Sequence, residues 1–235
     1  MASSTIPETP DEQKRKIRGI EDKAQARFSE THDARELAFR LSREVIRNSA
    51  NSIRATHRGE FDQARELVAT AGRMVKEIEG RLDGHPAVYY AGFVEDGQKE
   101  YVEASATLAF AESSALPTPD ELGVGYAPYL NGLAESVGEL RRFILDGLRR
   151  DDFSRCEELM ELMDEVYSIL VSMDFPEAIT RGLRRTTDMV RGVLERTRGD
   201  LTLALRQRRL EQTLARFEAG RGEPPSSPRQ AQDGV

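Results

Sequence analysis

Apolar side chains recur every three or four residues along most of the chain, which is the spacing of one face of an α-helix. The clearest stripe lies on a helix predicted from about Pro128 to Arg149, and its apolar members are Leu133, Val137, Leu140, Ile144 and Leu148. No stretch shows the alternation of β-branched and polar residues that is typical of a strand. The pattern therefore predicts an all-α fold, a bundle of about seven helices.

The same periodicity predicts the other helices and the places where they end. Helices are expected over 11–57, 61–82, 89–113, about 154–171 and about 179–217, with weak interruptions at 29–33 and 96–97. Thr118 is expected to cap a short helix that has Pro119 at its first position. Ser154, with Glu157 three residues later, is typical of a capping box and is expected to open the next helix.

The two ends of the chain differ from its middle. Residues 1–10 carry two prolines and are expected to be a flexible N-terminus, and the proline-rich, weakly apolar stretch 218–235 is expected to be a disordered tail. A single helical domain is expected over 11–217. The chain has no apolar run long enough to span a membrane, no signal-like N-terminus, and one cysteine, Cys156. A soluble cytoplasmic protein, with Cys156 as a core thiol, is the expectation.

Charge is unevenly distributed along the chain, whose net charge is −7. From Ala91 to Glu139 there are nine acidic residues and one basic residue, Lys99, whereas nine arginines lie between Arg181 and Arg209. Phosphate binding depends largely on Lys and Arg, so the overall sign argues against a nucleic-acid partner. The distribution instead predicts one anionic surface suited to metal ions and one cationic surface suited to phosphates.

Four carboxylates in the acidic stretch have the spacing of pairs on one helix face. Glu100 and Glu103 are three residues apart, and Glu135 and Glu139 are four apart. A divalent ion held between the two helices would relieve the repulsion within each pair, and oxygen ligands suit Mg²⁺ or Mn²⁺. The competing interpretation is a solvated acidic face, because Glu135 and Glu139 lie opposite the apolar stripe of their helix.

Other site types are excluded or left open by the residues themselves. The Glu-x-x-His motif of di-iron bundles, Gly-rich phosphate loops, HExxH and the nucleophile elbow are all absent. His57, just before Arg58-Gly59, is expected to cap the end of a helix. The arginines near Arg184 alternate with acids at helical spacing, which fits either a salt-bridged helix or a phosphate-binding one.

Several segments together resemble the translin family, in particular its catalytic branch, translin-associated factor X. The segments are 32–43, 97–104 (GQKEYVEA), 116–124 (LPTPDELGV), 129–140 (YLNGLAESVGEL), 174–178 and 182–188, and the resemblance covers about residues 28–203. It implies an α-helical fold of about seven helices and a hollow homo-oligomer, often of eight subunits, with the catalytic face turned inward. An acidic face opposite the core of one chain can then border an enclosed cavity.

The resemblance also implies a function and a set of site residues. Glu100, Glu103, Glu135 and Glu139 match the metal-binding, catalytic positions of an Mg²⁺- or Mn²⁺-dependent endoribonuclease that acts on single-stranded RNA. Single-stranded DNA is a further expected partner, and no membrane is. The expected nucleic-acid contacts are Arg43, Arg184 and Arg185.

Two departures from the family keep a second interpretation open. The catalytic branch usually has Asp where this chain has Glu135, and the RNA-binding branch has a basic stretch where this chain has the acidic segment 91–96. The alternative function is a non-catalytic binding protein for single-stranded RNA or DNA with the same fold. A purely structural helical scaffold is the third interpretation.

Overall fold

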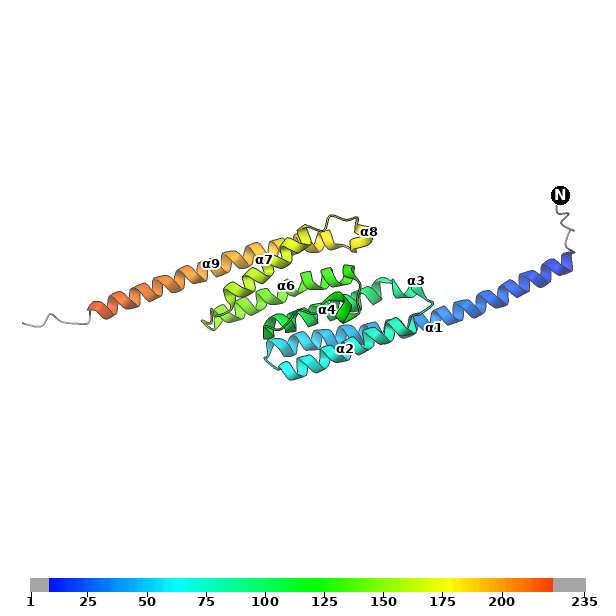
Figure 1. Cartoon of the computed structure of the whole chain (residues 1–235), viewed down its shortest axis with the longest axis horizontal. Helices are drawn as coiled ribbons and strands as arrows, with labels where there is room; N and C mark the ends of the chain where they lie inside the picture. Colours follow the sequence, from blue (N-terminus) through cyan, green and yellow to red (C-terminus); the bar gives the residue numbers. More distant parts are fainter. Residues whose placement is uncertain (1–8, 222–235) are drawn as a thin grey trace, which may run out of the picture.

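The computed structural model describes residues 9–221, and this part of the chain forms nine α-helices and no strand (Figure 1). Six helices are long: α1 (Pro10–His57), α2 (Phe61–Arg81), α4 (Gly92–Glu112), α6 (Tyr126–Arg149), α7 (Cys156–Val171) and α9 (Leu183–Arg221). Three have four residues each: α3 (Pro86–Tyr89), α5 (Pro119–Leu122) and α8 (Glu177–Thr180). The predicted all-α fold is confirmed, and the single-turn helices α3 and α8 are additions to it.

The long helices pack as a series of layers with α4 and α6 in the middle. α1 and α2 form an antiparallel pair, α4 packs on both, α6 packs on α4, and α7 and α9 cover the other side of α6 (Figure 1). Side chains of the predicted α6 stripe are the centre of the core, since Val137, Leu140 and Ile144 are fully buried. α6 is therefore in contact with other helices on two sides, and one of these faces α4.

A glycine sets how closely α4 and α6 approach each other. A Cβ atom added to Gly132 would lie 2.4 Å from the Lys99 carbonyl oxygen and 2.8 Å from Cβ of Val102. Any side chain at position 132 would therefore push the two helices apart. This contact lies one turn before Glu135 on α6 and beside Glu100 on α4, so it brings the predicted acidic pairs together.

Some of the local predictions are confirmed and some are wrong. Thr118 caps α5 through a reciprocal capping box with Glu121. The capping box at Ser154 is not formed, because Ser154 binds the Asp152 carboxylate instead and α7 begins at Cys156. The predicted interruptions at 29–33 and 96–97 are absent, because α1 and α4 are continuous there. In α4, Gly97 is buried against Ser42 of α1, and this packing holds it in its helix.

Two helical arms extend beyond the bundle at opposite ends (Figure 1). They are the N-terminal part of α1 and the C-terminal part of α9. α1 begins at Pro10 with Thr9 as its cap, and α9 continues to Arg221. The remaining parts of the predicted flexible tails, 1–8 and 222–235, lie outside the described residues. Within 9–221, no helix combines the length and the apolar character needed to cross a membrane.

Candidate metal centre

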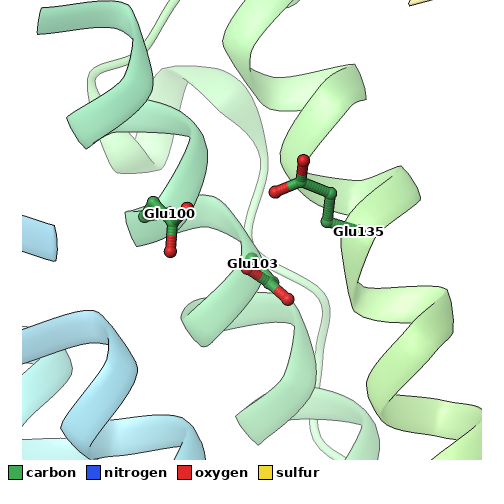
Figure 2. Close-up of side chains that lie close together, drawn as sticks. All are labelled: Glu100, Glu103 and Glu135. Carbon is green, nitrogen blue, oxygen red and sulfur yellow. The ribbon is translucent and has the colours of Figure 1, made fainter. Parts of the chain in front are cut away.

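Three of the four predicted carboxylates meet between α4 and α6. One carboxylate oxygen from each of Glu100, Glu103 and Glu135 lies within 4.8 Å of the others. Glu100 and Glu103 are one turn apart on α4, and Glu135 extends across from α6 (Figure 2). All three side chains are partly buried. The interpretation of these residues as a freely solvated face is therefore wrong for this cluster, because the face of α6 that carries Glu135 packs against α4.

Burial and mutual repulsion perturb the ionisation of the cluster. Burial, followed by the charges of Glu100, Glu135 and Glu139, raises the pKa of Glu103 to about 8. Burial also raises the pKa of Glu100, although Lys99 opposes this effect. Both shifts have the same physical origin: negative charge is concentrated where little water can solvate it. A bound cation would neutralise that negative charge.

Lys99 is the cation that the cluster already contains. Its Nζ donates a hydrogen bond of 2.9 Å to Oε1 of Glu135 and lies 3.9 Å from Oε1 of Glu100. Burial disfavours the charge of Lys99, but the hydrogen bond to Glu135 and the charges of Glu135, Glu100 and Asp96 outweigh burial and raise the pKa of Lys99. Sequence reasoning noted Lys99 only as the single basic residue of the acidic stretch, and missed this contact.

The fourth predicted carboxylate, Glu139, is bonded to other partners. His57 Nε2 donates a hydrogen bond to Oε2 of Glu139, and Arg142 Nη1 lies 3.7 Å from the same oxygen. The bond with His57, opposed by burial, lowers the pKa of Glu139. The predicted capping role of His57 is wrong, because its nearly buried ring stacks on Phe143 and reaches Glu139. Glu139 lies one turn beyond Glu135 and outside the three-carboxylate cluster.

A cleft of about 560 Å³ adjoins the cluster on the side of α8 and α9. Its charged lining residues are three acids, Glu95, Asp96 and Glu135, and three bases, Lys99, Arg181 and Arg185. Asn131 forms part of its wall and connects three elements. The Asn131 side chain donates to the Thr180 carbonyl oxygen at 3.0 Å and accepts from the Thr186 hydroxyl at 2.9 Å. The cleft thus joins the carboxylates to the start of the arginine-rich helix.

The three predicted nucleic-acid contacts lie in three different places. Arg185 borders the cleft beside Glu135. Arg184 borders a separate cleft of about 800 Å³ between the end of α7, α8 and α9, together with Asp188 and Glu177. Arg43 lies on the exposed face of α1, with its guanidinium 5.9 Å from the centre of the Phe39 ring. Of the three, Arg185 is the one that the fold brings to the carboxylates.

The donor set fits a divalent ion such as Mg²⁺ or Mn²⁺. These ions prefer oxygen ligands, and two helices supply three converging carboxylates. The raised pKa of Glu103 and the ammonium of Lys99 at Glu135 both indicate a place where a positive charge is stabilised. Glu100, Glu103 and Glu135 are the residues that would hold the ion.

The chain is similar in sequence and fold to a protein of which two solved structures match it. The chain is 31% identical to C3PO of Archaeoglobus fulgidus, a translin-type protein, with a TM-score of 0.74 over 80% of this chain and 97% of that one. A second structure, of the same protein in complex with duplex RNA, matches with 30% identity and a TM-score of 0.73 over the same shares.

Two further matches are more distant in sequence. C3PO of Neurospora without ligand, at 19% identity, has the same fold, with a TM-score of 0.66 over 86% of this chain and all of that one. An uncharacterised protein of Methanocaldococcus jannaschii is 29% identical over 188 residues, 79% of this chain and 83% of the relative. No family model matches the chain. Sequence identity over four-fifths of its length and agreement in fold nonetheless show that this protein belongs to the translin family.

Proposed function

We propose that the protein is a metal-dependent endoribonuclease that cleaves single-stranded RNA inside a homo-oligomeric shell. The observation that carries this proposal is the convergence of Glu100, Glu103 and Glu135 beside a cleft that ends at Arg185. Carboxylates provide the metal ligands, and arginine and lysine provide phosphate contacts. The relative from Archaeoglobus fulgidus was solved with RNA, which supports RNA as the substrate class.

The proposed reaction is hydrolysis of a phosphodiester. Water adds to phosphorus, the bond from phosphorus to one ester oxygen breaks, and one proton of the water ends on the leaving oxygen. The products are a phosphate monoester and a free hydroxyl. A divalent ion at the carboxylates would supply Lewis-acid chemistry, by lowering the pKa of water and neutralising phosphate charge. The protein residues hold that ion, and Arg185 orients the RNA backbone in the cleft.

Glu139 is proposed to complete the site as a fourth carboxylate, one turn beyond Glu135. In the described structure, His57 and Arg142 hold its side chain. Its role therefore requires either a change of rotamer or a bridging water. A bridging water would leave His57 as the group that fixes where the Glu139 carboxylate lies, whereas a change of rotamer would break the bond with His57.

The alternative is a binding protein of the same family that does not cleave RNA. Lys99 favours it, since an ammonium on Glu135 can neutralise the carboxylates without a metal. The two functions differ in one respect: the binding protein needs no divalent ion at the cluster. Measurements of metal dependence therefore separate them.

The test is cleavage of an end-labelled RNA, offered as single strand and as duplex, with Mn²⁺ or with a chelator. We expect Mn²⁺-dependent cleavage of the single strand. Glu100→Gln and Glu103→Gln should each reduce it by more than about 100-fold, since even the outer-shell partners of metal ligands are worth about 10- to 100-fold.

Glu79→Gln, on the exposed side of α2, is the matched control and should keep full activity. Cleavage that survives both cluster substitutions, from protein free of contaminating nuclease, would refute the site. Absence of any cleavage in Mn²⁺, with RNA binding retained, would establish the binding-protein alternative.

A further inference from the structure

Lys99 is positioned between two places that need a positive charge. On one side its Nζ lies 2.9 Å from Glu135 and 3.9 Å from Glu100, inside the carboxylate cluster. On the other side Lys99 lines the 560 Å³ cleft that leads to Arg185. Its side chain is only one-quarter exposed, so a small rotation of the flexible stem moves the ammonium from the cluster to the cleft without exposing it fully.

A divalent ion at the cluster would compete with Lys99 for the same carboxylates. Nζ of Lys99 is bonded to Glu135 and lies near Glu100, and these are two of the three residues that would hold the ion. The same carboxylate oxygens cannot serve both cations well, because Nζ of Lys99 lies where an ion bound to Glu135 and Glu100 would repel it. Binding of the ion is therefore expected to displace the ammonium from Glu135.

The cleft is where the displaced ammonium has an anion to bind. In the absence of metal, the three acids and three bases that line the cleft balance, and Lys99 is engaged by Glu135 while Arg181 is engaged by Glu95 at 3.3 Å. Within residues 9–221 Arg185 forms no ion pair, and it lies at the cleft with its charge available. Release of Lys99 would give the cleft a second available cation next to the carboxylates.

We propose that Lys99 is an exchangeable cation, and this inference rests on the proposed function. In the metal-free protein its ammonium neutralises Glu135 and Glu100. When a divalent ion takes these carboxylates, Lys99 turns into the cleft and binds the backbone phosphate of the RNA that lies next to the ion. The lysine then takes the place of a second metal ion. Strong RNA binding in the cleft therefore depends on the divalent ion bound at the carboxylates.

The first test is a calorimetric titration with Mn²⁺ alone. Lys99→Gln and Lys99→Met should both bind Mn²⁺ at least about 10-fold more tightly than the wild type, because the competing ammonium is gone. The wild type should bind one ion per chain. Lys76→Gln, the same change at an exposed lysine of α2, is the control and should bind like the wild type. Equal or weaker Mn²⁺ binding by both Lys99 variants would overturn the proposal.

The second test is binding of a single-stranded RNA in Ca²⁺ and in chelator, with the RNA recovered intact. In Ca²⁺ the Lys99 variants should bind several-fold more weakly, and their plot of log affinity against log salt should be shallower by about one released counterion. In chelator they should bind like the wild type. The exchange would be contradicted if the Lys99 variants lost the same RNA affinity in Ca²⁺ and in chelator, or lost none in either.

Failure of this inference is distinguishable from failure of the proposed function. If the wild type binds no Mn²⁺, the metal centre itself is refuted, and both proposals fail. If the wild type binds Mn²⁺ and cleaves RNA, while the Lys99 variants keep the same Mn²⁺ affinity, the proposed nuclease function stands. Only the role of Lys99 is then refuted.

Discussion

At the scale of single residues, Glu103 is the group whose ionisation depends most on folding. Its pKa rises from 4.5 to about 8, so the folded chain holds a proton between these pH values that the unfolded chain has lost. Folding takes up a proton in this window, and the free energy of unfolding therefore falls as the pH rises from 4.5 to 8. Glu103 destabilises the metal-free protein above that window.

Glu103→Gln should remove this pH dependence. We expect the variant to be more stable than the wild type at pH 8 by at least about 1 kcal/mol, given that each pKa unit corresponds to about 1.4 kcal/mol. Urea unfolding of the metal-free proteins at pH 5 and pH 8 measures the difference. Glu79→Gln controls for a Glu-to-Gln change on an exposed helix face. A Glu103→Gln protein that is less stable at both pH values would contradict the burial argument.

Arg184 and Arg185 are neighbours in sequence that border different clefts. Arg185→Glu should weaken RNA binding and reduce its salt dependence, because Arg185 lies beside the carboxylates. Arg184→Glu, with the same change in charge on the same turn, should have the smaller effect. Fluorescence anisotropy over a range of salt concentrations measures both. Equal losses would mean that RNA follows the whole arginine face of α9 rather than the cleft.

At the scale of helices, the contact at Gly132 determines whether the site forms. Gly132→Ala places a Cβ 2.4 Å from the Lys99 carbonyl oxygen, so α4 and α6 must separate. Overpacking of this kind costs about 1–3 kcal/mol. Gly138→Ala is the matched control on the same helix, since nothing lies within 4 Å of a Cβ there, and it should stabilise by about 0.5–1 kcal/mol. Urea unfolding checks both, and a destabilised Gly138→Ala protein would contradict the comparison.

The helices were predictable from the sequence, whereas several contacts between them were not. The spacing of Leu133, Val137 and Leu140 identified the buried face of α6, because helical periodicity is a local property. The bond between His57 and Glu139 joins residues 82 positions apart, and no local pattern reports it. Lys99 was visible as a single basic residue, but its position at Glu135 depends on the register of α4 against α6.

At the scale of the molecule, both arms carry apolar side chains that nothing in the described chain covers. Ile17, Ile20 and Phe28 are exposed on α1, and on α9 a single stripe of exposed residues comprises Leu203, Leu210 and Leu214. Apolar stripes at helical spacing are typical of helix–helix contacts. A second copy of the chain is the partner that the proposed homo-oligomer supplies.

Light scattering should accordingly give a mass several times the 26.4 kDa of one chain. Replacing both Leu210 and Leu214 by Glu should lower that mass, because two charges would be buried in the contact. Gln212→Glu, on the opposite side of α9, should leave the mass unchanged. A wild-type chain that remains a monomer at micromolar concentration would contradict the enclosed shell.

The central claim is that Glu100, Glu103 and Glu135 bind a divalent ion. The most direct measurement is an anomalous difference map from a crystal of the protein with Mn²⁺. We predict a peak with an oxygen of each of the three carboxylates at about 2.0–2.6 Å, and Nζ of Lys99 moved away from Glu135. A map without a peak at these residues, in which Lys99 still binds Glu135, would contradict the account.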